Sequence, residues 1–550
     1  MDKRVEGGGC SHPPGFEDRM PADGECSISR ILARHAAARP DQPAVIQDDG
    51  STWTWHEFHE KVLRAAAGLR RLGVARGEVV INWQPNSGEM LVTWFALSSL
   101  GAIHFPMNTA FKGAMLADAI RLSGARLMIA HADLCARLEA DNLAGLSDVV
   151  VIQDRLDQPL APGLARHAFS SVAGAAPLLS QDLPEVQPWD TACLLLTSGT
   201  TGNSKLVQVP LGQIWTLARA MYWFMRPDDR LMNIYPLFHI AAIGGVMSAL
   251  VQGAAIIQTP AFRTQTFWDS VRRLGATALP GLTPAMIEFL NKAEPGPEDV
   301  QNPLRVAVVR QASPAIAQFC RRFDLDYVPS YSMTEASCIA VGGFSPPPLG
   351  QCGRARDGIE VRLVDEHDIE VPCGQVGQLI FRPRLPWTVN AGYWRNPEAT
   401  AAAWRNGWFH TGDAMRMDQD GNLYHVDRMS DTIRRRGENI SSLEIEREAL
   451  GHQGVADAAA VGVESELGDQ EVLLYIQPRE NCRIDEPEFL LFLMERLPHY
   501  MVPQYLAIVP DLPRTQSGKV RKLELRAQGL VAGAWDRSAA GITVKRDSFS

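Results

Sequence analysis

The feature that most constrains the fold is an alternation of amphipathic helical segments with short apolar runs. Residues 55–72 have the apolar spacing of a helix and are followed by an apolar run at 79–83. The same succession recurs at 90–100 and 102–106, at 114–123 and 127–130, and at 266–274 and 276–279. Helices that alternate with strand-like runs predict βα units and mostly parallel sheets.

The pattern changes in the second half of the chain, and the change indicates domain boundaries. From about Gly358, short apolar runs bounded by turn residues follow one another at 359–366, 377–383 and 421–427. After Arg428 the polarity rises and αβ alternation resumes on a smaller scale. Because 550 residues exceed the ~100–200 of a typical domain, we expect at least two domains. The predicted parts are a leader (1–27), a large domain (28–428), a hinge (429–431), a small domain (432–535) and a frayed tail (536–550).

Charge and cysteine usage exclude several classes of protein. The net charge is −10 and the pI is about 5.8. This argues against sequence-independent nucleic-acid binding, which depends on clustered Lys and Arg. The nine cysteines are scattered and form no C-x-x-C pair. We therefore expect neither a disulfide framework nor a zinc site.

No secretory signal and no membrane span are expected. The first 20 residues lack the apolar run of a signal peptide. The most membrane-like stretch, 240–257, is interrupted by Gly244, Gly245 and Gly253 and is shorter than the about 20 apolar residues of a span. We predict a buried helix followed by a strand there, in a soluble cytoplasmic protein.

A candidate phosphate-binding loop follows an apolar strand at residues 194–205, which read LLLTSGTTGNSK. Glycines allow the backbone to turn its N–H groups toward an anion, hydroxyls add donors, and a lysine adds charge. The alternative is an ordinary surface turn rich in Ser, Thr and Gly. Five hydroxyls, two glycines and one lysine within 197–205 favour phosphate binding. The loop does not fit the Walker pattern.

Two further segments carry carboxylates that could bind a cation or hydroxyl groups. YSMTE at 331–335 places a hydroxyl next to a carboxylate, which suits a hard cation that bridges phosphates. Its alternative interpretation is the first turn of a surface helix. GWFHTGD at 407–413 ends in Asp413, and a carboxylate accepts two hydroxyl donors well. Alone, that residue is more often a solvated loop charge.

Together with PRTQSGKVRK at 513–522, these segments resemble, in chain order, the motifs of the adenylate-forming superfamily. This superfamily comprises acyl-CoA synthetases, nonribosomal-peptide adenylation domains and luciferases, and the chain is most similar to an acyl-CoA synthetase. The resemblance extends over about residues 28–530. The chain departs from the usual motifs at Ser204, Leu206, Ser332 and Ser430. The family usually has proline, glycine, glycine and aspartate or lysine at these positions.

The resemblance implies that most candidate residues hold the nucleotide and its metal. Tyr331 is implied to pack against adenine, and Asp413 and Arg428 are implied to hold the ribose. Glu335 and Thr200 are the implied Mg²⁺ ligands. The nucleotide-binding set is Thr197, Ser198, Gly199, Thr200, Thr201, Gly202, Lys205, Tyr331, Ser332, Met333, Thr334, Asp413 and Arg428.

Other roles implied by the resemblance concern catalysis and the thiol step. Lys519 contacts the carboxylate and the α-phosphate during adenylation, where its charge stabilises the transition state. Glu335 and His239, the latter beside the acyl group, complete the predicted catalytic set. Ser430 is the hinge residue. The residues on the CoA side are Arg434, Gly437 and Glu438. The arginine run 434–436 fits CoA phosphates and a solvated face equally well.

The resemblance also implies a fold and a reaction. The fold class is α/β and α+β: a large N-terminal domain of βα layers with a β-barrel-like subdomain, and a small mobile α+β lid. A carboxylate would attack the α-phosphate of ATP and release pyrophosphate, and a thiol would then attack the acyl-AMP. The implied cofactors and co-substrates are ATP, Mg²⁺ and CoA.

The substrate follows less directly from the residues. YPLFHIAAIGG at 235–245 matches the region that shapes the acyl pocket and contains no aspartate that could hold an α-ammonium group. Its apolar surroundings favour an apolar or polycyclic acid over an amino acid. Two alternatives remain: an enzyme that loads a carrier-protein thiol, and a catalytically lapsed nucleotide-binding regulator. Luciferase-type oxygen chemistry has no support in the residues, and the oligomeric state is left open.

Overall fold

The computed structural model describes residues 17–140, 143–153, 160–197, 204–344, 349–428, 433–435, 438–440, 442–464, 470–497, 501–514 and 519–544. The chain divides into two compact units. The large unit comprises Met1–Val361, Phe381–Phe409 and Asp420–Tyr424. The small unit comprises Arg362–Ile380, His410–Gln419 and His425–Ser550.

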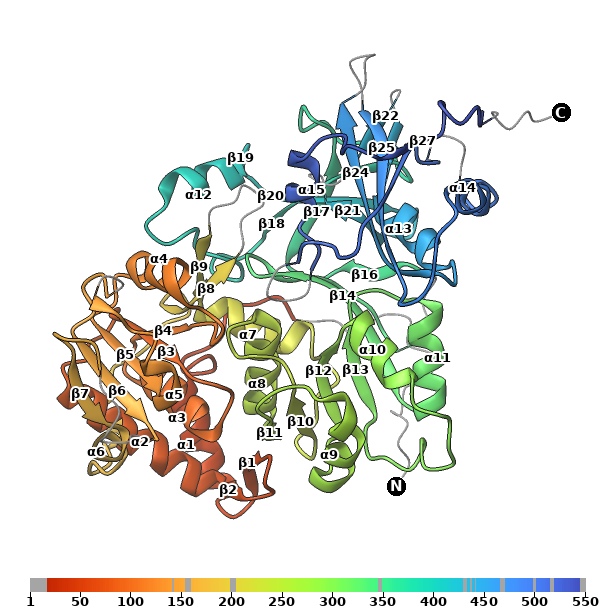
Figure 1. The fold of residues 1–550 in the computed structure, drawn as a ribbon. Coiled ribbons are helices and arrows are strands. Elements are labelled where there is room, and N and C mark those ends of the chain that lie inside the picture. The colour runs from red at the N-terminus through yellow and green to blue at the C-terminus, as the bar shows by residue number, and fades with distance from the viewer. Residues whose placement is uncertain are drawn as a thin grey trace. The chain divides into compact units, whose positions relative to one another are not determined.

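The first sheet of the large unit is parallel except at one edge (Figure 1). Its strands, in spatial order, are β7 (Ala165–Ala168), β6 (Asp148–Ile152), β5 (Leu127–His131), β3 (Val79–Trp83), β4 (Ile103–Pro106), β8 (Thr191–Thr197) and β9 (Lys205–Pro210). Strands β8 and β9 pair antiparallel. Val80 lies in one apolar cluster and its neighbour Ile81 in another. Because successive strand residues face opposite sides, both faces of this sheet are buried.

The second sheet of the large unit has a parallel centre and antiparallel ends. Its order is β16 (Gln351–Ala355), β15 (Ser337–Val341), β14 (Asp326–Met333), β13 (Val306–Val309), β12 (Ala278–Leu282), β10 (Arg230–Asn233), β11 (Ala255–Gln258), β1 (Pro43–Gln47) and β2 (Thr52–Thr54). Strands β17 (Ile359–Val364), β18 (Val376–Pro383), β20 (Trp408–Met417) and β21 (Asn422–Arg428) each contain residues of both units. The short β19 (Trp404–Arg405) pairs with β20.

Helices cover both faces of these sheets. They are α1 (Ile28–Ala38), α2 (Trp55–Arg71), α3 (Gly88–Ser99), α4 (Gly113–Ser123), α5 (Ala132–Cys135), α6 (Phe169–Ala173), α7 (Leu211–Ala220), α8 (Ile240–Gln252), α9 (Phe267–Leu274), α10 (Pro284–Asn291), α11 (Pro314–Phe323) and α12 (Pro397–Ala403). Thr54 and Glu57 form a capping box that starts α2. Helices α7 and α8 lie side by side (Figure 1) and approach closely, since a Cβ on Gly244 would lie 2.4 Å from Leu217 Cδ2.

The predicted alternation is confirmed. Helices α2, α3, α4 and α9 and strands β3, β4, β5 and β12 stand where the sequence placed them, with ends that differ by a few residues. The stretch 240–257 forms the buried helix α8 and the strand β11, as predicted. None of the helices in the described ranges is long and apolar enough to cross a membrane.

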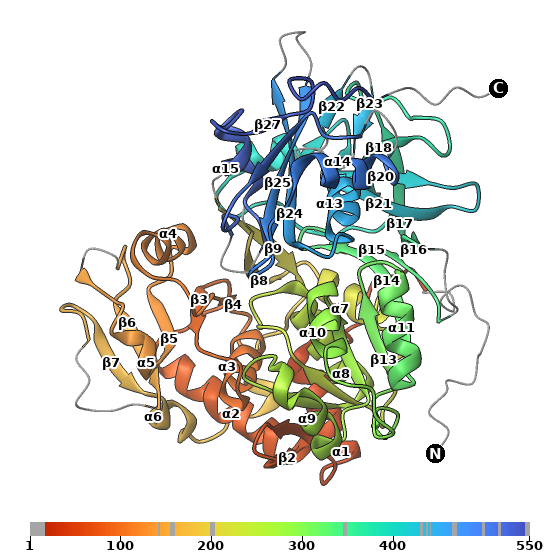
Figure 2. The same cartoon turned by 45° about the vertical axis from the view of Figure 1, so that its right-hand side comes forward.

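The small unit is a sheet covered on both faces (Figure 2). Its strands run in the order β24 (Val455–Glu464), β25 (Gln470–Pro478), β26 (Tyr505–Ile508) and β27 (Trp535–Asp536), and β22 (Ile433–Arg435) pairs with β23 (Glu438–Ile440). Helices α13 (Ser442–Leu450) and α14 (Glu486–Met494) cover the face that carries Ala460, and α15 (Lys522–Ala527) covers the face that carries Val461.

Both ends of the described chain pack against neighbouring elements. Arg19, in the predicted leader, forms an ion pair of 2.6 Å with Glu25 and lies 5.4 Å from the ring centroid of Trp215. After Trp535, where the sequence predicted fraying, Arg537 is buried and Ile542 packs against the apolar core of the small unit. The physical reason is that this segment retains apolar side chains that the sheet can bury.

A buried ion pair aligns the starts of the central parallel strands. Arg305 Nη2 lies 2.5 Å from Asp229 Oδ2, and both side chains are less than 10% exposed. Asp229 Oδ1 also accepts a hydrogen bond of 2.7 Å from Thr277 Oγ1. Asp229 precedes β10, Thr277 precedes β12 and Arg305 precedes β13. One carboxylate therefore connects three strand starts.

Replacing Asp229 with alanine should destabilise the large unit by about 3–5 kcal/mol, because the Arg305 charge would remain buried without its partner. Denaturant unfolding followed by tryptophan fluorescence measures this. The matched control is Asp228→Ala, which removes an exposed carboxylate next to it. Equal unfolding midpoints for the two variants would contradict the assigned role of the ion pair.

Two buried histidines should make the chain sensitive to acid. Burial lowers the pKa of His104 to about 3 and that of His35 to about 4. In the unfolded chain the pKa is about 6.5, so the unfolded state binds more protons as the pH falls below that value. The stability conferred by each neutral ring is complete above pH ~6.5 and declines toward its folded pKa.

Lowering the pH from 7.5 to 5 should therefore reduce the free energy of unfolding of the wild type by about 2 kcal/mol more than that of His104→Leu. The measurement is denaturant unfolding of both proteins at the two pH values. Comparing their differences isolates His104 from the carboxylates, which are the same in both proteins. An identical acid-induced loss in both would show that His104 becomes protonated without cost in the folded state.

Candidate functional site

The predicted phosphate loop is closed by an antiparallel pair of strands. Ser198, Gly199, Thr200, Thr201 and Gly202 lie outside the described residues. On either side, Thr197 at the end of β8 lies opposite Lys205 at the start of β9. Thr197 Oγ1 donates a hydrogen bond of 3.4 Å to Lys205 O. The strand pairing therefore holds the two ends of the loop together, as a phosphate loop requires.

Lys205 faces an aromatic ring that sequence reasoning missed. Its Nζ lies 5.1 Å from the ring centroid of Tyr393, which is within the range of a cation–π interaction. Lys205 is partly buried and Tyr393 is buried. The ring thus limits where the lysine ammonium group can lie beside the loop.

The YSMTE segment ends in a tight turn between two paired strands. The pairing of β14 with β15 shifts between Tyr331 and Ser332, which marks a bulge. Thr334 and Glu335 then form the turn. Gln213 Nε2, from α7, donates to Thr334 O at 2.9 Å and to Ser337 Oγ at 2.7 Å. The turn is therefore fixed from outside by a buried amide.

Glu335 is buried, and two residues from one distant segment bind it, one at the carboxylate and one at the backbone carbonyl. Tyr393 Oη donates a hydrogen bond of 2.9 Å to Glu335 Oε1. Asn390 donates to Glu335 O twice, from its backbone N and from Nδ2, at 2.8 Å each. Burial, and then the neighbouring Glu335 charge, raise the pKa of Tyr393. The phenol therefore stays protonated and remains a hydrogen-bond donor.

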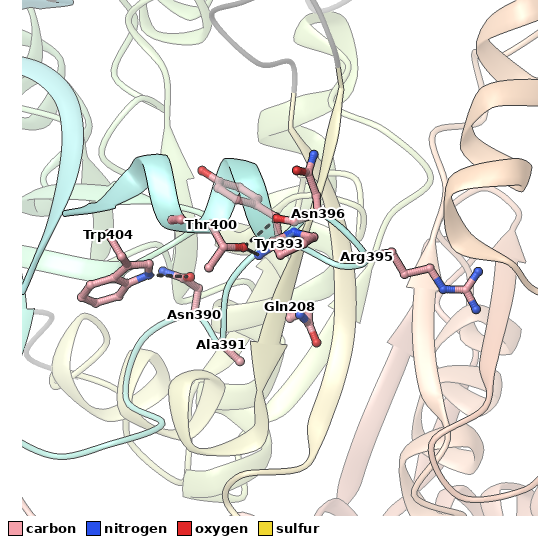
Figure 3. Close-up of a pocket in the computed structure, with 10 residues that line it drawn as sticks. Gln208, Asn390, Ala391, Tyr393, Arg395, Asn396, Thr400 and Trp404 are labelled. Carbon is pink, nitrogen blue, oxygen red and sulfur yellow. Dashed lines mark hydrogen bonds between the residues drawn. The ribbon is translucent and has the colours of Figure 1, made fainter.

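Tyr393 thus brings together two residues predicted independently, Lys205 for phosphate and Glu335 for Mg²⁺. No sequence signal identified Tyr393 or Asn390, because neither belongs to a cluster of titratable residues along the chain. Beside Tyr393 lies an open hollow of about 680 Å³ (Figure 3). Its lining includes Gln208, Asn390, Tyr393, Arg395, Thr400 and Trp404.

The remaining residues of YSMTE differ in exposure. Tyr331 is 2% exposed within β14, Ser332 is exposed, and Met333 and Thr334 are partly buried. The predicted packing of Tyr331 against adenine stays a prediction. Oxygen donors such as the Glu335 carboxylate fit Mg²⁺. No cluster of three potential His, Cys, Asp or Glu ligands occurs among the described residues.

The loop before α8 is tied to the loop that follows β3. Asn86 Nδ2 donates to Tyr235 O at 2.9 Å, and Asn86 Oδ1 accepts from Leu237 N at 3.1 Å. His239 is exposed at the start of α8, with its ring centroid 4.6 Å from that of Phe238. Ile243, counted in the sequence among the apolar surroundings of the acyl group, is fully buried in the core. Its apolarity therefore reports on packing more than on the acid.

In the small unit, Asp413 is buried at 2% exposure in β20. Its backbone N donates to Thr411 Oγ1 at 3.1 Å, and His425 Nε2 lies 3.9 Å from Asp413 Oδ1. Arg428 ends β21, and its side chain lies outside the described atoms. The ribose-binding role of both residues remains a prediction.

Lys519 is exposed, and a largely buried ion pair of Lys522 lies three residues after it. Val520, the residue after Lys519, forms an isolated β-bridge with Arg514. Lys522 Nζ forms an ion pair of 2.8 Å with Glu446 Oε1, and both side chains are largely buried. The C-terminal motif thus combines an accessible lysine with one that fixes its position in the small unit.

The arginine run corrects one expectation. Arg435 Nε lies 2.6 Å from Glu471 Oε2 and Arg435 Nη1 donates to Val502 O at 3.1 Å. Because its side chain is only 3% exposed, Arg435 belongs neither to a solvated face nor to a CoA-binding surface. Ser430, Arg436 and Gly437 and the side chains of Arg434 and Glu438 lie outside the described atoms.

Comparison with known families identifies the class. Residues 32–394 match the AMP-binding enzyme family, and residues 444–519 match the AMP-binding enzyme C-terminal domain. The chain belongs to the AMP-binding enzyme family. The predicted adenylate-forming membership and mixed α/β fold, with a large N-terminal and a smaller C-terminal domain, are thereby confirmed.

Individual relatives include CoA ligases. The chain is 29% identical over 489 residues to a crotonobetaine/carnitine–CoA ligase of Salmonella paratyphi C, covering 86% of this chain and 93% of the relative. The anthranilate CoA ligase AuaEII in complex with anthranoyl-AMP superposes with a TM-score of 0.79 at 22% identity, covering 94% and 98% of the two chains. ATP-bound MatB from Rhodopseudomonas palustris gives 0.79 at 25% identity, covering 92% and 98%.

Proposed function

We propose that this protein is an ATP-dependent acyl-CoA synthetase. It activates a carboxylic acid as acyl-AMP and transfers the acyl group to the thiol of CoA. The observation that carries the proposal is the contact of one buried tyrosine, Tyr393, with both Lys205 and Glu335. In a chain of the AMP-binding family, this arrangement supports a site for a nucleoside triphosphate and its cation.

The chain's own residues divide the work of adenylation. Lys205 and the backbone of the loop before it bind phosphate oxygens. Asp413 accepts hydrogen bonds from the ribose hydroxyls. Lys519 positions the substrate carboxylate next to the α-phosphate. When Mg²⁺ is bound, it supplies charge neutralisation at the phosphates, with Glu335 and Thr200 as its protein ligands.

The two half-reactions balance without any further reagent. A carboxylate oxygen of the acid forms a bond to the α-phosphorus, and the bond from that phosphorus to pyrophosphate breaks. The thiol sulfur of CoA then bonds to the acyl carbon, its proton leaves to solvent, and AMP departs. The mixed anhydride makes the second step easy, because AMP is a far better leaving group than oxide.

The proposed acid is apolar or polycyclic and is not an amino acid. The segment 235–245 is largely apolar and carries no carboxylate that could hold an ammonium group. CoA is the proposed acceptor because the relatives include enzymes named as CoA ligases.

The test is incubation of the purified protein with ATP, Mg²⁺ and CoA and a panel of fatty, aromatic, polycyclic and amino acids. Mass spectrometry then follows acyl-AMP and acyl-CoA. We expect acyl-CoA from one or more apolar acids. Acyl-AMP without acyl-CoA would point to a carrier-protein thiol instead. An amino acid as the preferred substrate would overturn the proposed acid class.

Lys519→Ala should lower acyl-AMP formation by about 10²–10³-fold, because it removes a charge that acts on the transition state. Thioester formation from supplied acyl-AMP should change little. Rapid-quench assays of the two half-reactions measure this split, with Lys292→Ala, an exposed lysine of the large unit, as control. Equal losses in both steps would assign Lys519 another role.

A further inference from the structure

We propose that Tyr393 is a positioning residue that sets the orientation of the Glu335 carboxylate for Mg²⁺ and its distance from the phosphate lysine Lys205. The proposal rests on the proposed function, in which Glu335 is a metal ligand. It adds a residue that neither the motifs nor the family match assigns.

The hydroxyl group of Tyr393 controls the rotation of the carboxylate. It donates to Glu335 Oε1 at 2.9 Å, and both residues are less than 10% exposed. A hydrogen bond to an ionised acceptor is stronger than one between neutral groups. With Oε1 directed to the phenol, the plane of the carboxylate is set before any cation arrives. Pre-orientation of this kind lowers the entropic cost of binding.

The backbone around Tyr393 is hydrogen-bonded to β9, the strand that follows the candidate phosphate loop. The segment 390–394 runs alongside β9: Trp394 N donates to Leu206 O at 2.7 Å, and Gln208 N donates to Gly392 O at 2.9 Å. Tyr393 itself bridges to Val207. Its backbone N also donates to Thr400 Oγ1 at 2.9 Å, which ties it to α12 (Figure 3).

The same segment holds the backbone of the metal turn. Asn390 donates twice to Glu335 O, each at 2.8 Å. The segment 390–394 therefore connects β9, which begins at Lys205, with the turn that carries Glu335. Tyr393 is the member of this segment whose side chain contacts both functional groups, through its ring and through its hydroxyl.

These two contacts can be separated by substitution. Tyr393→Phe keeps the ring under Lys205 and removes only the hydrogen bond to Glu335. Tyr393→Leu removes both contacts. If Tyr393 positions the metal ligand, the phenylalanine variant should lose the effect of Mg²⁺ on ATP binding while keeping metal-free ATP binding. The leucine variant should also bind metal-free ATP more weakly, because Lys205 loses its aromatic partner.

Calorimetric titration of ATP, in EDTA and at saturating Mg²⁺, tests the proposal without turnover, because no acid substrate is present. The readout is the ratio of the two affinities, called here the magnesium enhancement. We expect this ratio to fall about tenfold in Tyr393→Phe, with the affinity in EDTA unchanged. Tyr327→Phe, which removes another buried tyrosine hydroxyl, on β14, should keep both values.

Glu335→Gln and the double variant complete the experiment. Because both substitutions act on one interaction, the double variant should lose no more of the magnesium enhancement than Glu335→Gln alone. Thermal unfolding midpoints near that of the wild type show that Tyr393→Phe is folded.

Two results overturn the proposal in distinguishable ways. A normal magnesium enhancement in Tyr393→Phe, together with a loss in Glu335→Gln, would leave the metal role of Glu335 intact and remove Tyr393 from it. A normal enhancement in Glu335→Gln would remove the metal role itself and the proposal with it. Additive losses in the double variant would also overturn the proposal, because they show two independent effects.

Discussion

The structure of the large unit depends on the alignment of its central parallel strands by the buried pair Asp229 and Arg305. One carboxylate joins the starts of β10, β12 and β13. Parallel strands whose first residues are aligned also have their carboxyl ends at the same side of the sheet. In open α/β sheets, the ligand-binding segments follow these carboxyl ends. The loop before α8 and the turn that carries Glu335 both follow strands of this sheet.

The segment 390–394 is a second constraint, and it acts between sheets of the large unit. It runs along β9 of the first sheet and binds the Glu335 turn, which belongs to the second sheet. The candidate phosphate loop and the turn that carries Glu335 are far apart in the sequence. The hydrogen bonds of one short segment connect the strand that follows the loop with this turn, and this explains how the proposed nucleotide site can span two sheets without a shared strand.

The sequence predicted the elements well and the contacts poorly, for different physical reasons. Apolar periodicity is local, so α2, β3 and α8 could be placed from the residues alone. Lys205 and Glu335 could be proposed as site residues from the sequence because motif chemistry is also local. Tyr393 was missed because its role arises from a long-range hydrogen bond that no pattern encodes. Arg435 was misjudged because a run of charges does not reveal which member is buried against Glu471.

Asn86 lies in the loop that follows β3 of the first sheet and binds the loop before α8, so the segment proposed to shape the acyl pocket is anchored from outside its own sheet. Evolutionary change in acid preference therefore has two routes, substitution within the loop and substitution at its anchor. A directed-evolution library confined to residues 235–245 would sample only the first. Including positions around Asn86 would let the loop backbone vary as well as its side chains.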